Sequence, residues 1–179
     1  MTEAILIQQA QNGCHNSFSQ LVKIHQARLY NYLLARCQNS YDADDVLQET
    51  FISAYKYLHS YNDKWQFNTW LFTIAKRLLK KQSKFSQQYD DLSKIDTSVE
   101  LEELAIDKNN IWIQIKKIVN CDAYDLLWFF YVEELSIKEI AIICQKSQSW
   151  VKISLYRAKK KLSINNSIRV LSKDYLMQG

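Results

Sequence analysis

The chain has almost none of the residues that make tight turns. Its 179 residues include no proline, and its two glycines are Gly13 and Gly179. Short hairpins depend on glycine, and most other turns use glycine or proline, so this shortage argues against a β-sheet protein. Hydrophobic residues make up 47% of the chain, enough to build a core without disulfides or a metal. We therefore predict an all-α fold, with Gly13 ending a short first helix.

The segment 42–58 predicts an amphipathic helix with a polar exposed face. Asp42 is the expected N-cap, because an aspartate there can accept hydrogen bonds from the first free N–H groups. Apolar residues recur at helical spacing and predict a buried stripe: Leu47, Phe51, Ala54, Tyr55 and Leu58. Another face carries Asp45, Gln48, Glu49 and Ile52. Carboxylates and an amide on one face are suited to holding a protein partner.

The next predicted helix begins near residue 67 and has a basic exposed face. Its expected inward residues are Phe67, Trp70, Leu71, Ile74, Ala75 and Leu78. Its basic residues are Lys76, Arg77, Lys80, Lys81 and Lys84. Residues 64–89 contain six lysines and arginines and no acidic residue. Because the positive charge is segregated in this way, we expect the helix to face an anion such as a nucleic acid.

The sequence pattern predicts two small helical domains joined by an acidic linker. The N-terminal domain is expected at 1–84 and the C-terminal domain at 110–165, followed by a tail at 166–179. The linker is expected at 85–109. Residues 85–108 carry seven acidic residues against two lysines, which gives a net charge of −5. Such a composition is typical of a solvated tether.

The C-terminal domain is predicted to contain a helix-turn-helix. Ser136 and Glu139 have the spacing of a capping box and open a short helix, and Asp122 is expected to cap the helix before it. A tight turn at Gln145 precedes Ser147, which can cap the last helix. The expected inward residues of that helix are Val151, Leu155, Ala158 and Leu162. Two short helices joined by so brief a turn are typical of DNA-binding proteins.

The last helix is expected to contact DNA through its exposed polar and basic side chains. Side chains early in such a helix reach base edges, while later cations contact phosphates. The candidate DNA-binding residues are Gln148, Ser149, Lys152, Tyr156, Arg157, Lys159 and Lys160. Residues 141–173 contain eight basic residues and no acidic one. The alternative interpretation is a three-helix bundle with a solvated basic face.

The sequence contains no catalytic constellation. It has no glycine-rich phosphate loop, HExxH motif or nucleophile elbow, so we expect no enzyme activity and no cofactor. The four cysteines are scattered without CxxC spacing, so we expect reduced thiols and no metal site. No apolar run approaches the roughly 20 residues of a membrane span. We therefore expect a cytoplasmic protein with no membrane insertion.

Two stretches resemble a known family. DADDVLQETFISAYKYL followed by FNTWLFTIAK resembles the second conserved region of bacterial sigma factors of the extracytoplasmic-function group. LSIKEIAIIC followed by VKISLYRAKKKL is similar to the fourth conserved region of the same group. The resemblance implies a transcription initiation subunit that binds core RNA polymerase and promoter DNA. Anti-sigma factors regulate many members of this group, so such a factor is a candidate partner.

The resemblance also implies a role for individual residues. Asp45, Gln48, Glu49 and Ile52 match positions that dock on the clamp helices of the polymerase β′ subunit. The fourth region is expected to read the upstream promoter element and to rest on the flap of the β subunit. The residues expected to hold unstacked bases and the single strand during promoter opening are Tyr61, Trp65, Phe67, Lys76, Arg77, Lys80 and Lys81.

The chain departs from the family pattern at several positions. Arg77 and Lys81 stand where asparagine and aspartate are common, and Gln145 stands where the family usually turns on glycine. Trp150 replaces a smaller residue and Ser154 replaces a common arginine. Two alternative functions stay open from the sequence. One is a stand-alone helix-turn-helix regulator, and the other is a degenerate sigma-like module that sequesters polymerase or a regulator.

Overall fold

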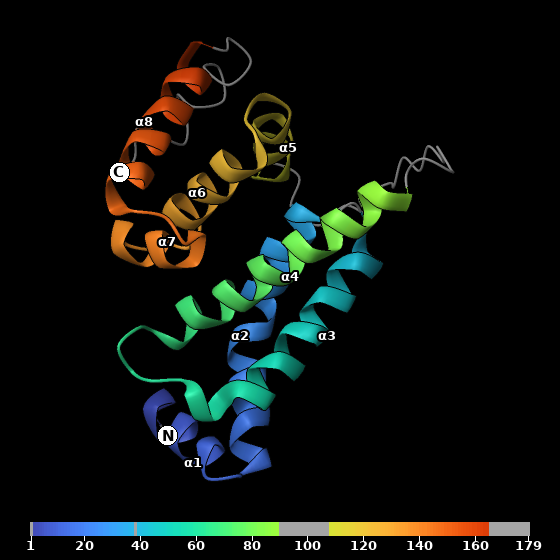
Figure 1. Ribbon diagram of the computed structural model, residues 1–179, viewed down its shortest axis with the longest axis vertical. Coiled ribbons are helices and arrows are strands. Elements are labelled where there is room, and N and C mark those ends of the chain that lie inside the picture. The colour runs from blue at the N-terminus through green and yellow to red at the C-terminus, as the bar shows by residue number, and fades with distance from the viewer. Residues whose placement is uncertain (1, 38, 90–107, 165–179) are drawn as a thin grey trace. The chain divides into compact units, whose positions relative to one another are not determined.

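The computed structural model describes residues 2–37, 39–89 and 108–164, and every secondary-structure element in these ranges is a helix (Figure 1). The predicted all-α fold is therefore confirmed. The chain divides into two units, residues 1–99 and 100–179. Most of the predicted linker and the predicted tail lie outside the described residues.

In its described residues, the N-terminal unit contains four α-helices and one 3₁₀ turn. Its elements are α1 (Glu3–Gln11), α2 (His15–Arg36), α3 (Ser40–Tyr57), η1 (Leu58–Ser60) and α4 (Phe67–Tyr89). Helix α3 packs between α2 and α4, while α1 packs on α2 and on η1 (Figure 1). Gly13 has φ +90°, a conformation that favours glycine, and it turns the chain from α1 into α2 as predicted. Helix α4 continues to Tyr89, past the predicted domain end at residue 84.

The core of this unit joins α1 and α2 to both ends of the connector between α3 and α4. Its buried members are Leu6, Ala10, Phe18, Leu21, Ala54, Leu58, Phe67 and Leu71. A second contact packs Tyr32 of α2 edge-on against Phe72 of α4, with ring centroids 5.5 Å apart. Both of these aromatic rings are fully buried. The aromatic content of the chain thus fills the space between the long helices.

The buried stripe of α3 differs from the predicted one. Tyr55 is 41% exposed, and its hydroxyl lies 2.8 Å from Nδ1 of His15. The buried side is made by smaller residues: Ala43, Val46, Thr50 and Ala54. Thr50 can be buried because its hydroxyl donates to the Val46 carbonyl at 2.6 Å. Small side chains let α3 approach its neighbours closely, so the larger residues lie at the margin.

The N-cap of α3 is Asn39 and not Asp42. The Asp42 backbone N–H donates to Oδ1 of Asn39 at 2.8 Å, and Nδ2 of Asn39 donates to Oδ2 of Asp42 at 3.0 Å. The same correction applies to α6, where Asn120 accepts from the Ala123 N–H at 2.9 Å and Asp122 lies in the first turn. In both cases the aspartate stays near the positive end of the helix dipole.

His25 is a buried titratable residue of α2 that faces α1 and the start of α4. Its Nε2 atom lies 3.4 Å from Oε2 of Glu3, and its ring centroid lies 5.3 Å from that of Phe67. Burial lowers the pKa of His25 below its ordinary value of 6.5, while the Glu3 carboxylate opposes the shift and Arg28 adds to it. The folded state therefore binds fewer protons than the unfolded state as pH falls below 6.5.

We expect the stability of the N-terminal unit to decrease as pH falls from 7 to 5. The contribution of His25 is complete above its unfolded pKa and is lost as pH falls toward its lower folded pKa. Urea midpoints across this range should fall less steeply for His25→Leu than for the parent. His59→Gln, which replaces an exposed histidine, is the control and should follow the parent. Equal slopes for all three proteins would exclude His25 as the source.

The C-terminal unit contains four α-helices in its described part. They are α5 (Lys108–Ile118), α6 (Cys121–Tyr131), α7 (Ile137–Cys144) and α8 (Gln148–Ile164). Helix α8 packs on α5, α6 and α7, and α6 also packs on α5 and α7. The fully buried side chains include Leu126, Leu127, Phe129, Ile140 and Val151. Within the described ranges of the chain, no helix has both the length and the apolar content that crossing a bilayer requires.

The turn between α7 and α8 has the predicted geometry. The capping box is confirmed, because Ser136 accepts from the Glu139 N–H and the Glu139 carboxylate accepts from the Ser136 N–H. Gln145 is left-handed with φ 54°, and the next N–H donates to the Ala141 carbonyl at 2.9 Å. Ser147 then accepts from the Trp150 N–H at 3.1 Å. The glutamine thus adopts the conformation that glycine usually supplies at a helix end.

We expect Gln145→Gly to stabilise the helix-turn-helix by about 1 kcal/mol, because glycine adopts the left-handed conformation without the side-chain penalty. Amide hydrogen exchange in α7 and α8 measures this local opening free energy. Arg157→Gly, in the middle of α8, should have the opposite effect of about 1 kcal/mol, because glycine weakens a helix interior. Unchanged exchange in Gln145→Gly would show that the turn does not limit local opening.

Candidate nucleic-acid and protein interfaces

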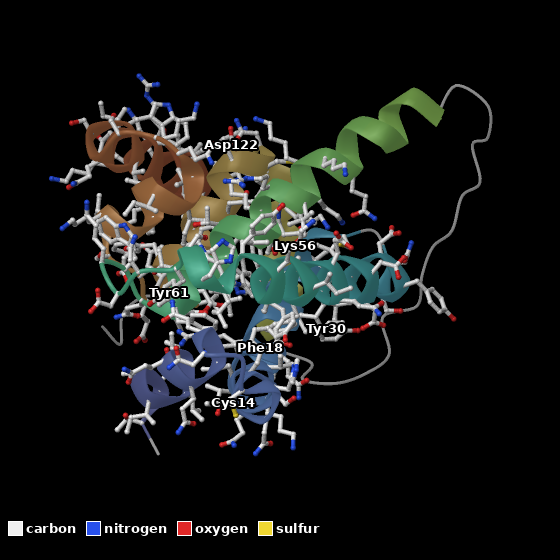
Figure 2. The ribbon with its side chains drawn as sticks, turned by 60° about the horizontal axis from the view of Figure 1, so that its bottom comes forward. Cys14, Phe18, Tyr30, Lys56, Tyr61 and Asp122 are labelled. Atoms are coloured by element: carbon white, nitrogen blue, oxygen red, sulfur yellow. The ribbon has the colours of Figure 1, made fainter. Side chains whose placement is uncertain are left out.

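The polar face of α3 is fully available on the N-terminal unit. Asp45, Gln48, Glu49 and Ile52 follow the spacing i, i+3, i+4, i+7, and all four are exposed. Ile52 is 53% exposed although it is apolar. Lys56, one turn further along, lies at the end of the same face (Figure 2). We refer to Asp45, Gln48, Glu49 and Ile52 as the α3 face.

Tyr41 extends this face and was not predicted from the sequence. It lies four residues before Asp45 and is 82% exposed, in the first turn of α3. An exposed aromatic ring beside carboxylates and an isoleucine is the mixture of groups that protein interfaces use as anchors. Its position two residues after the N-cap Asn39 gave no periodicity signal, because only one turn of helix precedes Asp45.

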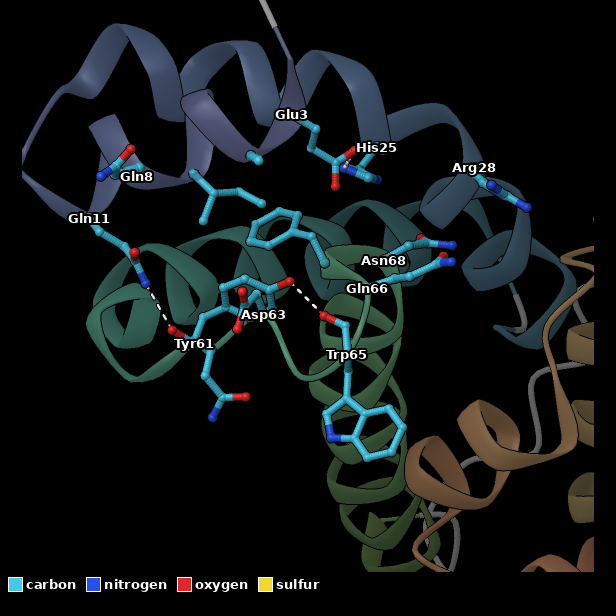
Figure 3. A pocket seen from close by; sticks show the side chains of 14 residues that line it. Glu3, Gln8, Gln11, His25, Arg28, Tyr61, Asp63, Trp65, Gln66 and Asn68 are labelled. Carbon is cyan, nitrogen blue, oxygen red and sulfur yellow. Dashed lines mark hydrogen bonds and ion pairs between the residues drawn. The ribbon is translucent and has the colours of Figure 1, made fainter.

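A pocket of about 720 Å³ lies between α1, α2 and the start of α4 (Figure 3). Its wall includes the connector 61–66, which contributes Tyr61 and Trp65. Polar side chains converge on it from three helices, among them Glu3, Gln8, Arg28 and Asn68. The pocket combines aromatic surface with donors and acceptors, which is what an unstacked base requires.

The connector is fixed by hydrogen bonds from α1 and from within itself. Nε2 of Gln11 donates to the carbonyls of Leu58 at 3.1 Å and Tyr61 at 2.9 Å. The Tyr61 hydroxyl donates to the Trp65 carbonyl at 2.6 Å (Figure 3). Burial, with the nearby Glu3 and Asp63 carboxylates, raises the pKa of Tyr61, so its hydroxyl keeps the proton that it donates. Helix α1 therefore positions the pocket, which the sequence analysis did not predict.

The three aromatic residues predicted to accept bases have different environments. Phe67 is 1% exposed and packs against Tyr61 and Trp70, with ring centroids 5.2 and 5.5 Å away. Its ring belongs to the core and leaves almost no surface for a stacked base. Tyr61 is half-buried, while the half-buried Trp65 projects its indole from the connector beside α4 (Figure 3). Of the three, Trp65 presents the best surface for a base.

The basic residues of α4 begin two turns beyond the pocket. Arg77, Lys80 and Lys81 are exposed, and Lys76 is half-buried. The residues at i and i+4 form two neighbouring rows along the helix, Lys76 with Lys80 and Arg77 with Lys81. Helix α4 contains no acidic residue, so its exposed surface is positively charged next to the pocket.

Helix α8 is anchored by the predicted residues. Val151, Leu155 and Ala158 are buried and Leu162 is half-buried. The outward line opposite them follows from the rotation of about 100° per residue and contains Ser149, Ile153, Tyr156 and Lys160. All four are exposed, Ile153 by 51% and Tyr156 by 66%. Sequence reasoning missed Ile153, because only polar and aromatic side chains were considered as contacts.

The remaining predicted residues of α8 lie on its two flanks. Gln148 and Lys152 are exposed on one flank, where Nζ of Lys159 lies 4.9 Å from the Phe130 ring centroid. Arg157 is on the other flank, beside a hollow of about 340 Å³ at the start of α6 that Trp150 also lines. Nζ of Lys146 lies 5.4 Å from the Trp150 ring centroid. Trp150 is therefore part of the packing around the turn.

Comparisons with known proteins agree with this geometry. The family model for sigma-70 region 2 matches residues 21–86, and the model for sigma-70 region 4 matches residues 125–162. The chain is 28% identical over 157 residues to the ECF RNA polymerase sigma factor SigM of Bacillus subtilis, covering 82% of this chain and 93% of the relative. It is 27% identical over 187 residues to the ECF RNA polymerase sigma-E factor of Haemophilus influenzae, covering 96% and 97%.

Solved structures share the fold. The complex of CnrH with the cytosolic domain of CnrY superimposes with a TM-score of 0.69 at 22% identity, covering 89% of this chain and 94% of CnrH. The sigma factor RpoE of Bartonella quintana, in complex with the anti-sigma factor NepR, gives a TM-score of 0.66 at 18% identity, covering 82% and 94%.

Two helical units that carry sigma-70 regions 2 and 4 define a sigma factor of RNA polymerase. This chain belongs to the sigma-70 family, in its ECF group. It binds core RNA polymerase and promoter DNA and directs transcription initiation. Sigma factors are regulators of transcription and are generally not enzymes.

Proposed function

We propose that this sigma factor docks on the clamp helices of the polymerase β′ subunit through the α3 face. The observation that carries the proposal is the joint exposure of Asp45, Gln48, Glu49 and Ile52 at helical spacing, on a helix whose other side is buried. Two carboxylates and an amide match a basic coiled coil, and the exposed Ile52 adds apolar contact. A stand-alone DNA-binding regulator has no need of such a face.

The pocket between α1, α2 and the connector then holds an unstacked base when the promoter opens. An unstacked base placed there would meet the Trp65 ring and polar groups, while the cations of α4 follow the single-stranded phosphates. Aromatic stacking of a base is worth about 1–3 kcal/mol and does not depend on which base is stacked. The extra charges at Arg77 and Lys81 strengthen phosphate contact.

We expect Trp65→Ala to weaken binding of single-stranded promoter DNA by the holoenzyme roughly 5- to 150-fold, the equivalent of one lost stack. The connector should keep its shape, because Tyr61 bonds the Trp65 carbonyl and not its ring. Fluorescence anisotropy with a labelled oligonucleotide of the non-template strand measures the loss. Tyr57→Ala is the control, since this exposed ring lies outside the pocket. Unchanged affinity in Trp65→Ala would exclude stacking on this residue.

Helix α8 reads the upstream promoter element in this proposal, and the C-terminal unit rests on the flap of the polymerase β subunit. Such a protein works where RNA polymerase works, in the cytoplasm. Among the similar solved structures, that of Bartonella quintana RpoE includes the anti-sigma factor NepR. An anti-sigma factor is therefore a candidate partner of this chain as well.

A further inference from the structure

An apolar side chain occupies the centre of the outward line of α8. Ile153 is the sixth residue of the helix, about 7.5 Å along the axis from its start. It lies between Ser149, one turn earlier, and Tyr156, three residues later. The buried residues Val151 and Leu155 lie on the far side of the helix, so Ile153 takes no part in the core.

The surroundings of Ile153 favour DNA over a protein partner. Helix α8 carries five basic residues and no acidic one, and Lys152 and Lys160 are exposed on either side of Ile153 along the helix. A surface of this charge complements a phosphate backbone. An isoleucine at its centre cannot form hydrogen bonds, so it can contribute to binding only where DNA itself presents an apolar group.

The major groove presents one such group. Thymine exposes its C5-methyl there, and no other base of DNA carries a methyl group on that edge. Apolar side chains of recognition helices contact this methyl. Tyr156 lies three residues from Ile153 and therefore on the same side of the helix, so both exposed side chains face the same way.

We propose that Ile153, with the ring of Tyr156 beside it, recognises the C5-methyl of a thymine in the upstream promoter element. This inference rests on the proposed role of α8 in reading that element. It adds a residue that selects a base by apolar contact, in the second turn of the helix, where side chains reach the groove floor. Ser149, Gln148 and Lys152 are then left to contact polar base edges nearby.

A double-mutant cycle tests the proposal by removing the thymine methyl from the DNA and the apolar side chain of Ile153 from the protein, separately and together. Duplexes are taken from promoters that the holoenzyme transcribes, and each upstream thymine is replaced in turn by deoxyuridine, which lacks only the methyl. At one position, we expect this change to weaken holoenzyme binding about fourfold, the equivalent of the ~0.8 kcal/mol gained by burying one such group. The same substitution should leave binding by Ile153→Ser unchanged. Ile153→Val, which keeps a branched apolar end, should remain sensitive to the methyl.

A second arm adds the methyl to another base. At the same position, the parent should bind DNA with 5-methylcytosine about fourfold better than DNA with cytosine. Ile153→Ser should bind these two DNAs with equal affinity. If deoxyuridine weakens the parent and Ile153→Ser by the same factor, or neither of them, Ile153 does not contact a thymine methyl. That result would leave the proposed function intact. If the holoenzyme transcribes no promoter or is indifferent to the upstream sequence, the proposed function itself fails.

Discussion

Asp45→Lys combined with Gln48→Ala is expected to abolish co-purification with core RNA polymerase. Both side chains lie exposed on the α3 face, one turn apart. Residues of this kind at the centre of an interface contribute about 2 kcal/mol or more each. The pair should therefore weaken binding roughly 1,000-fold or more. Affinity of labelled protein for core enzyme, measured by anisotropy, gives the change directly.

The fold should survive this double substitution. The N-cap is Asn39, which accepts from the Asp42 N–H, and the buried side is made by Val46, Thr50 and Ala54. None of these residues changes. Circular dichroism should therefore be the same as for the parent. Asp44→Lys is the matched control, because it makes the same charge reversal at an exposed residue one position away, on a different side of α3. If the double variant binds core as well as the control does, the α3 face is not the docking surface.

Lys152→Ala and Lys160→Ala are expected to weaken promoter binding in different ways. Lys152 lies early in α8, where side chains reach base edges, so its loss should relax preference at particular base pairs by about 1–3 kcal/mol. Lys160 lies two turns later, where we expect it to contact phosphate. Its loss should weaken binding equally for all sequences and reduce the slope of log K against log salt by about 0.9.

The two variants control for each other, because each removes one lysine from the same helix. Competition binding over a randomised upstream element, repeated at several salt concentrations, separates the two effects. Gln148→Ala should behave like Lys152→Ala. Identical sequence profiles for the parent and both early-helix variants would leave α8 as an anchor without base preference from these residues.

The helices themselves could be predicted because their signals are local. The capping box at Ser136 and Glu139 and the left-handed turn at Gln145 depend on residues within one or two turns of each other. Periodicity also identified the buried side of α8, with Val151, Leu155 and Ala158. The N-caps were less certain, since two polar residues compete for each helix start. In α3 the earlier one, Asn39, is the cap.

The pocket could not be predicted because it depends on contacts distant in sequence. Gln11 donates hydrogen bonds to carbonyls 47 and 50 residues away, and no pattern in the sequence predicts such a contact. Phe67 illustrates the same difficulty. An aromatic residue at the first position of a helix can either close the core or face a ligand, and only the packing of α1 and Tyr61 decides that it is buried.

A sigma factor must bring polymerase and promoter together. Transcription from genomic fragments by core RNA polymerase, with and without this protein, measures whether this chain does so. We predict discrete start sites that appear only when the protein is added and that disappear with the Asp45→Lys and Gln48→Ala double variant. A protein that binds DNA fragments but changes no start site, or that only reduces transcription by core enzyme, would contradict the account.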